Sequence, residues 1–145
     1  MWKKHLTAVN QHRKLILDTL DYIWKNPETG YREWKTHAYM ADIFRALGYT
    51  LTEAGDIPGF YTVLDTGRPG PEVLILGELD SLICPEHPDA DPVTGAVHCC
   101  GHSAQCAALL GIAAALKEPG ALDELSGSIA DTHHFFSVFI GLIRI

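Results

Sequence analysis

Apolar positions at the start of the chain recur with a helical period. Their three- and four-residue spacing predicts one amphipathic helix that ends before Asn26 and Pro27, because proline disfavours helical geometry in the residue before it. A second helix is predicted over residues 33–47, with Gly48 as its stop signal. The positions that define the two faces are Leu6, Val9, Arg13, Ile16, Leu20 and Ile23 in the first helix, and Ala41, Phe44 and Leu47 in the second.

The middle of the chain shows the shorter pattern of strands. Residues 50–53 and 60–65 are predicted strands, and residues 73–76 form an apolar run that is typical of a strand buried on both faces. Residues 66–71 are rich in Gly and Pro and predict a tight turn. We therefore expect the strands before and after this turn to pair as a hairpin.

The second half of the chain begins with an irregular stretch. Residues 81–98 predict a long loop, and loops of this length in compact domains are usually functional. An alanine-rich helix is predicted from about Ser103 to Lys117, with Gly111 allowing it to pack closely on a sheet. From residue 128 onward the pattern fits no single element. The order of elements predicts an α/β fold in layers.

Composition and charge narrow the classes of function. The chain has 145 residues, of which 47% are hydrophobic and 20% charged, and its net charge of −7 disfavours nucleic-acid binding. It shows no secretory signal and no apolar run long enough to span a membrane, so we expect a cytoplasmic protein. The four cysteines lack the spacing of a disulfide framework, and free thiols are available as metal ligands.

Two carboxylates follow the apolar strand at 73–76. Glu78 and Asp80 are two residues apart, so their side chains share one face of an extended chain. Open α/β sheets bind ligands at the carboxyl ends of their strands, which favours a functional pair. A pair of surface acids at a strand end is the alternative.

A second cluster precedes the alanine-rich helix. His98, Cys100 and His102 alternate, and an extended segment would direct all three the same way. Imidazole and thiolate are good ligands for zinc and similar ions. Gly101 permits a bend, and Ser103 is a candidate helix cap. The cluster favours a metal site over a loop with incidental histidines.

These segments carry a family resemblance. GELDSL at 77–82 is similar to a G-E-x-D-A-L-P strand end, and VHCCGHS at 97–103 is similar to a G-H-x-C-G-H-N loop. NPETGYREWKT at 26–36 resembles an H-P-E-G-x-E-x-K-T opening. These patterns are typical of the amidohydrolase branch of the aminoacylase/carboxypeptidase metallopeptidases, which includes aminobenzoyl-glutamate and indoleacetyl-amino-acid hydrolases. The resemblance extends from about residue 6 to 129.

The resemblance implies a fold and roles for individual residues. It implies the N-terminal part of a zinc-peptidase-like catalytic domain, with helices packed on a mixed sheet. Cys100 and His102 match metal ligands, and Asp80 matches the catalytic-site acid that orients a ligand or supports the base. Glu78 and His98 occupy family positions to which we assign no role. The implied cofactor is a divalent metal, zinc or manganese first, with cobalt or nickel as alternatives, which activates water for amide hydrolysis.

The chain departs from the family pattern near its end. The family continues into a Q-P-A-E-E-G motif that supplies the general base and another ligand, whereas this sequence has no glutamate beyond Glu124. We therefore divide the chain into a partial catalytic domain, 1–129, and a divergent apolar tail, 130–145, as a truncated or frameshifted reading frame would produce. We interpret His133 and His134 as polar residues beside that tail rather than as substitute ligands. Ser103 also replaces the family's Asn or Asp.

Three functional hypotheses follow. The first is a metal-dependent hydrolase of N-acyl amino acids or aminobenzoyl-glutamate-like amides, incomplete and inactive as this chain. The second is a non-catalytic metal-binding or interaction fragment of the same fold. The third and weakest is a thiol enzyme using Cys100 with His98 or His102, which lacks an orienting third group. We expect a small acyl-amino-acid or peptide-like substrate, no nucleic-acid or membrane partner, and possible homo-oligomers.

Overall fold

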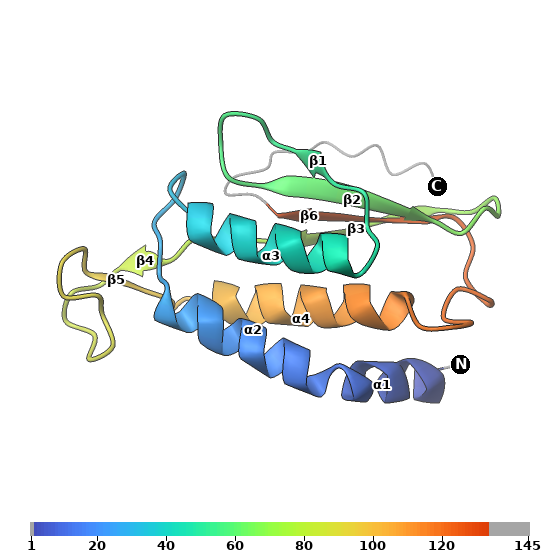
Figure 1. The fold of residues 1–145 in the computed structure, drawn as a ribbon, viewed down its shortest axis with the longest axis horizontal. Coiled ribbons are helices and arrows are strands. Elements are labelled where there is room, and N and C mark those ends of the chain that lie inside the picture. Colours follow the sequence, from blue (N-terminus) through green and yellow to red (C-terminus); the bar gives the residue numbers. More distant parts are fainter. Residues whose placement is uncertain (1, 134–145) are drawn as a thin grey trace.

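The computed structural model describes residues 2–133, and in this part of the chain helices cover one face of a four-stranded sheet (Figure 1). The α/β class predicted from the sequence is confirmed. The helices are α1 (Trp2–Gln11), α2 (Arg13–Lys25), α3 (Trp34–Ala46) and α4 (His102–Leu116). The strands are β1 (Thr52–Glu53), β2 (Phe60–Asp65), β3 (Glu72–Gly77), β4 (Leu82–Ile83), β5 (Ala96–Val97) and β6 (Ser128–His133).

The helical predictions hold, with one break. The single helix expected at the start of the chain is two helices, α1 and α2, separated at His12. The ring of His12 contacts Glu118 just after α4, with 2.8 Å between Nε2 and Oε1. The second helix ends as expected before Gly48, whose φ of 80° lies in the left-handed region that glycine adopts at low cost.

The order of the main sheet is β1-β2-β6-β3. Strand β6 lies between β2 and β3 and pairs antiparallel with the first and parallel with the second, so the sheet is mixed. The predicted hairpin of β2 and β3 is therefore wrong. The last described strand takes the place between them, and a pattern read from neighbouring segments does not detect this distant insertion.

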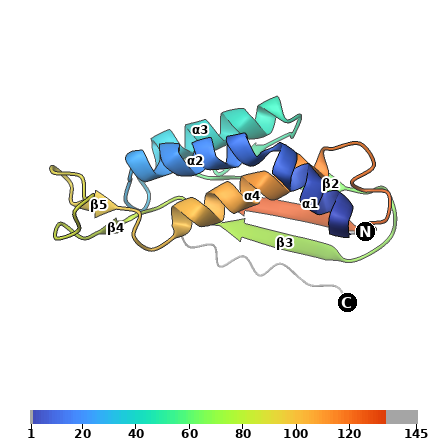
Figure 2. The same ribbon diagram turned by 90° about the horizontal axis from the view of Figure 1, so that it is seen from below.

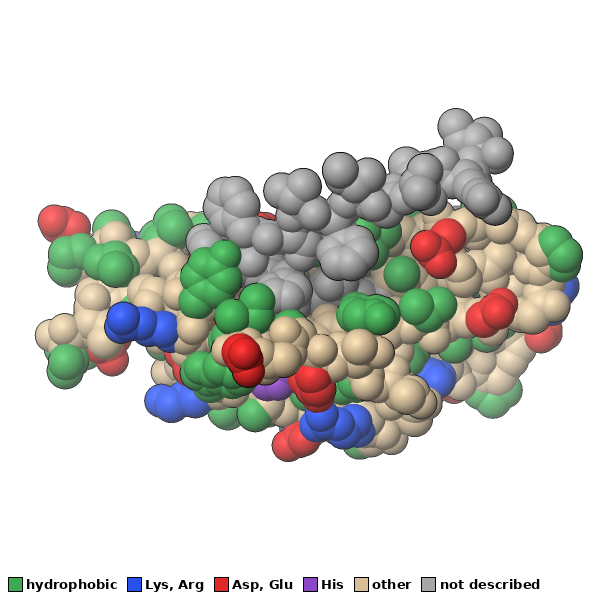
Figure 3. Space-filling model, turned by 90° about the horizontal axis from the view of Figure 1, so that it is seen from above, with side chains coloured by type: hydrophobic (Ala, Val, Ile, Leu, Met, Phe, Trp, Pro, Cys, Tyr) green, Lys and Arg blue, Asp and Glu red, His purple; other side chains and the backbone are tan. Residues whose placement is uncertain are grey.

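The two faces of this sheet have different surroundings. Residues directly opposite each other on paired strands share a face. The register places Phe60 and Thr62 on the face toward the helices, where both are buried. The outer face carries half-exposed apolar side chains, and Figure 3 looks onto it. These residues are Tyr61, Val63, Leu74 and Leu76, exposed by 40–49%.

The prediction that β3 is buried on both faces is therefore wrong. No described element covers the outer side of β3 or pairs with its free edge within residues 2–133. A strand buried between two layers requires such a four-residue apolar run, but the run does not show that a second layer packs on it.

The core lies between the sheet and the helices. Ile23, Met40, Phe44, Phe60 and Leu110 are each at most 1% exposed. Helix α4 packs on β3 and contacts the other three helices (Figure 2). Its central position explains why an alanine-rich helix without a polar face forms here.

Gly111 permits a close approach, but not the one expected. A Cβ atom built at Gly111 would lie 2.7 Å from Cδ1 of Ile16 in α2, so the glycine brings α4 close to α2 rather than to the sheet.

An arm extends from one end of the layers (Figure 2). It lies within the predicted loop at 81–98, where β4 and β5 form a small antiparallel sheet. Residues 2–133 include no helix long and apolar enough to cross a membrane. The domain boundary predicted after residue 129 falls inside β6, and the division of the chain there stays a prediction. The His133 and His134 side chains, and the tail from residue 134 onward, lie outside the described residues.

Candidate metal centre

The end of β3 delivers the two predicted carboxylates to the start of α4. Leu79 points into the core and is 1% exposed, so its neighbours Glu78 and Asp80 point the other way. Asp80 is 4% exposed, whereas the Glu78 side chain keeps about a third of its exposure. The predicted acid pair is thus brought together on one side of the chain.

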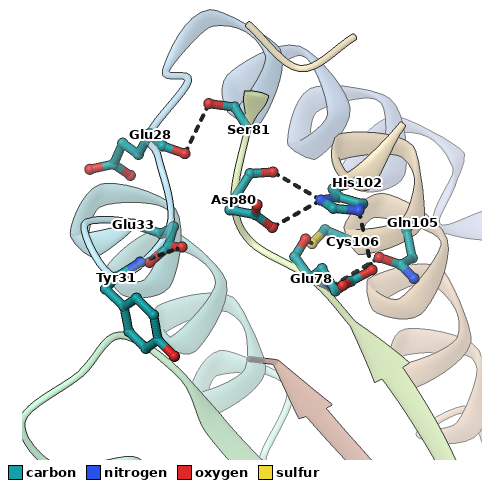
Figure 4. Close-up of polar contacts among 9 residues, drawn as sticks. All are labelled: Glu28, Tyr31, Glu33, Glu78, Asp80, Ser81, His102, Gln105 and Cys106. Carbon is teal, nitrogen blue, oxygen red and sulfur yellow. Dashed lines mark hydrogen bonds and ion pairs between the residues drawn. The ribbon is translucent and has the colours of Figure 1, made fainter. Parts of the chain in front are cut away.

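Both carboxylates meet the ring of His102 (Figure 4). Nδ1 of His102 lies 2.9 Å from Oδ1 of Asp80 and donates a hydrogen bond of 3.1 Å to the main-chain oxygen of Asp80. On the opposite side of the ring, Nε2 lies 3.1 Å from Oε2 of Glu78. Asp80 therefore fixes the orientation of the imidazole.

These contacts determine the tautomer of His102. A carbonyl oxygen only accepts hydrogen bonds, so Nδ1 must carry a proton. In the neutral ring Nε2 then presents a lone pair to a carboxylate oxygen at 3.1 Å. Two electron-rich atoms at this distance repel each other unless a proton or a cation lies between them. A carboxylate behind Nδ1 with a free Nε2 is the arrangement by which proteins orient metal-binding histidines.

Burial works against the charge on Asp80. The pKa of its carboxyl is raised above the ordinary value mainly because burial disfavours the anion, and the nearby charge of Glu78 adds to this. The His102 ring opposes the shift. A buried carboxylate held against a histidine is costly, which makes a functional role a better explanation than surface solvation.

The segment before α3 is hydrogen-bonded to Ser81, the residue that follows Asp80. The main-chain oxygen of Glu28 accepts hydrogen bonds from Ser81, at 2.7 Å from its N and 2.9 Å from its Oγ (Figure 4). The Glu28 carboxylate in turn accepts N–H groups of Lys35 and Thr36 at the start of α3. Helix α3 and the residue after Asp80 are thereby held together.

The same segment before α3 contains a buried carboxyl. Glu33 is 1% exposed and accepts the N–H of Tyr31 at 2.9 Å. Burial is the largest cause of its raised pKa, and the negative charge of Asp80 contributes. Tyr31 has a φ of 64°, a left-handed conformation that is rare for a residue with a side chain.

Glu28 and Glu33 were not among the predicted site residues. Their only sequence signal was the NPETGYREWKT resemblance, which assigned them no role.

Two residues of α4 hold the main chain of Glu78. Gln105 accepts its N–H through Oε1 at 2.9 Å, and the Cys106 thiol donates to its main-chain oxygen at 3.0 Å. They follow His102 by three and four residues and so share its side of the helix. Burial raises the pKa of Cys106 to about 12, so this cysteine remains a thiol. Cys106 is thus a buried structural donor. Gln105 was not among the predicted site residues.

The segment carrying His98 and Cys100 is a turn, not the extended chain expected. Gly101 has a φ of 99° and directs the chain into α4, and this helix begins without a capping side chain, so Ser103 is not its cap. Cys100 is exposed, whereas His98 is 1% exposed. Neither ring nitrogen of His98 has a hydrogen-bond partner among the described residues, which removes it as a base for Cys100.

The residues present include the kinds of donor that a metal site uses. His102 is oriented for coordination, Glu78 faces its free nitrogen, and the exposed Cys100 lies two residues before it. Residues 2–133 contain no group of three or more His, Cys, Asp or Glu side chains placed to hold a metal ion. The donor chemistry suits zinc and related ions, but the described ligand set is incomplete.

Comparisons with known proteins identify relatives of this chain. The sequence matches no protein-family model. It is 29% identical over 119 residues to a p-aminobenzoyl-glutamate hydrolase chain of Escherichia coli, covering 77% of this chain and 24% of that one. It is 31% identical over 110 residues to an IAA-amino acid hydrolase of Arabidopsis thaliana, covering 74% and 24%. The chain spans about a quarter of the length of the curated relatives it matches.

Solved structures show the same fold. A dinuclear metal-binding peptidase of the M20 family from Bacillus subtilis superposes with a TM-score of 0.72 at 20% identity, over 86% of this chain and 35% of that one. An aminobenzoyl-glutamate utilization protein from Klebsiella pneumoniae superposes with a TM-score of 0.64 at 22% identity, over 86% and 37%.

Proposed function

Because this chain belongs to the amidohydrolase branch of the aminoacylase/carboxypeptidase metallopeptidases, we propose that its Asp80–His102 pair is one part of a metal-dependent amide-hydrolysing site. The observation that carries the proposal is the His102 ring, held by Asp80 at Nδ1 with Nε2 directed at Glu78.

The contacts of His102 and Asp80, and the position of Cys100, support the following roles. His102 and Cys100 would hold the ion, and Asp80 is a positioning residue that acts through His102. A bound divalent ion would polarise the scissile carbonyl and lower the pKa of a water molecule. Glu78 lies close enough to His102 to act as a further ligand or to receive a proton from that water. The substrate class we propose is an N-acyl amino acid or a peptide-like amide, as the names of the relatives suggest.

A second candidate is supported by a specific observation. The described residues supply no set of three ligands placed to hold an ion. In this candidate the same fold serves as a metal-binding fragment without turnover. It predicts a bound metal ion and no hydrolysis.

Metal content of the purified chain tests the proposal. We expect about one equivalent of a divalent ion by elemental analysis, and its loss in a Cys100→Ala/His102→Ala double variant. Cys84→Ala is the matched control, because this thiol lies in the arm, and it should keep the metal. Hydrolysis of N-acyl amino acids by the loaded protein separates the two candidates. Equal metal content in the double variant and the unaltered chain would refute both.

A further inference from the structure

Two adjacent cysteines, Cys99 and Cys100, occupy the turn that leads from β5 into α4. The N–H of Gly101 donates a hydrogen bond of 3.4 Å to the main-chain oxygen of His98, so the two cysteines are the central residues of this turn. In a strand, neighbouring side chains point to opposite faces, but a turn does not impose this alternation. Both thiols are free and exposed, and a small molecule can therefore reach both from solvent.

The other two cysteines are poorly placed to react with this pair. Cys106 is buried and donates its thiol hydrogen to the main-chain oxygen of Glu78. Burial raises the pKa of Cys106 to about 12, so it does not supply the thiolate that disulfide exchange requires. The N–H of Cys84 donates to the main-chain oxygen of Gly95, and β5 separates that position from Cys99. Each thiol of the turn therefore has its neighbour in the sequence as its available partner.

A bond between consecutive cysteines differs from a structural disulfide. Adjacent Cα atoms lie about 3.8 Å apart across a trans peptide, whereas the usual separation in a disulfide is about 4.4–6.8 Å. The short separation strains the bond and makes it easier to reduce. Strained or exposed disulfides are the labile ones, so a bond between Cys99 and Cys100 would form and break with the supply of oxidant rather than hold the fold together.

We propose that Cys99 and Cys100 are a reversible oxidation site, at which a small disulfide converts the two thiols into one intramolecular disulfide. One cysteine loses its proton to water and attacks a sulfur of the small disulfide, and the first small thiol leaves. The neighbouring cysteine then loses its proton and attacks the protein sulfur of the mixed disulfide, which releases the second small thiol. The protein gives up two electrons and two protons in total, and the small disulfide takes them up.

The bond would also remove Cys100 from the proposed metal site. A sulfur atom in a disulfide is no longer a thiolate, and the thiolate is the form that binds a metal ion. This consequence rests on the proposed function, whereas formation of the disulfide does not, because neither step uses His102 or a bound ion. We therefore expect the oxidised chain to bind less metal than the reduced chain.

Intact-mass spectrometry of the full, metal-free chain after treatment with glutathione disulfide tests the proposal. We expect a monomer that has lost two hydrogen atoms, with peptide mapping that places the loss at Cys99 and Cys100, and reduced glutathione should reverse it. Cys99→Ser lacks the second thiol, so it should stop at a mixed disulfide that retains one glutathione. Cys84→Ser is the matched control and should still form the bond.

Several products would overturn the proposal: an unaltered chain that does not react or that retains glutathione, a bond that includes Cys84, or covalent dimers as the main product. Metal content then separates this site from the proposed hydrolytic one. Untreated Cys99→Ser should bind as much metal as the unaltered chain, and oxidation of the unaltered chain should lower its metal content until reduced glutathione restores it. An oxidised chain that carries the bond and keeps its metal would contradict the role of Cys100 as a ligand, but not the oxidation site.

Discussion

The interior between the helices and the sheet differs from the end of the sheet at Asp80 in the polarity of its buried side chains. In the interior, Ile23, Met40 and Phe44 are fully buried and apolar, so burial itself stabilises the fold. At the end of the sheet, Asp80 and His98 are also buried but ionisable. The Asp80 carboxylate contacts His102, whereas both ring nitrogens of His98 lack hydrogen bonds among the described residues. The apolar core and the buried ionisable groups thus lie in separate regions of one small structure.

The largest expected effect tests the interior. Phe44→Ala removes a side chain with no exposed surface that contacts Phe60 and Tyr49, and we expect the free energy of unfolding to fall by about 3–5 kcal/mol. Urea denaturation measures it. Tyr61→Ala is the control, since this aromatic ring is 46% exposed on the outer sheet face and should cost much less. Similar losses in the two variants would contradict the comparison.

The next effect tests the end of the sheet. Asp80→Asn keeps the shape of the side chain but removes the carboxylate that orients His102, so we expect metal affinity to fall by about 10–100-fold. Stability should not fall with it, because burial already disfavours the charge. Competition with a chelator measures the affinity. Asp91→Asn, in the arm, should leave it unchanged, and an equal loss there would argue against a specific role for Asp80.

The buried carboxyl of Glu33 should make the free energy of unfolding depend on pH, which apolar residues of the interior do not do. Its folded pKa is raised, so the native state binds this proton more tightly than the unfolded state does. Its contribution to stability is fully present below the ordinary glutamate pKa and is lost as pH rises through the raised value. We therefore expect Glu33→Gln to gain stability relative to the unaltered chain as pH increases from 4 to 7.

Urea denaturation across that pH range, for both proteins, provides the difference curve. A difference that is constant with pH would mean that Glu33 does not titrate differently in the folded state.

The smallest expected change in the free energy of unfolding concerns the outer face of β3. Leu74→Thr on the outer side of β3 should change the free energy of unfolding by less than about 0.5 kcal/mol, because the side chain is already 47% exposed. Leu110→Thr, in the buried face of α4, is the paired control and should cost several times more. Thermal unfolding of both variants gives the comparison. A large loss at Leu74 would show that this face is covered in solution.

Local patterns predicted the elements well. Residues 60–65 were predicted as a strand and form β2, and the helices at 33–47 and 103–117 form α3 and α4 within a residue of their predicted bounds. Helical period, glycine stops and apolar runs report on interactions within a few residues, which is why they succeed here. They missed the break at His12, whose ring contacts Glu118, more than a hundred residues away.

The candidate site was predicted in part. The sequence pattern and the family resemblance singled out Asp80 and His102, and the structure brings them together with Glu78. Their roles as catalytic acid and metal ligand, and that of Cys100, stay predictions. The supports from Glu28 and Gln105 could not be predicted, because each depends on how separate segments meet.

The sequence by itself determined the α/β class, most of the helices and strands, and the residue types from which a metal centre can be built. Only the tertiary structure decided that β6 separates β2 from β3. It also decided that, within residues 2–133, no element covers the outer face of β3, and that His102 is paired while His98 is not. The physical reason is range: propensity and periodicity act along the chain, whereas strand order, burial and the pairing of polar atoms depend on segments brought together by folding.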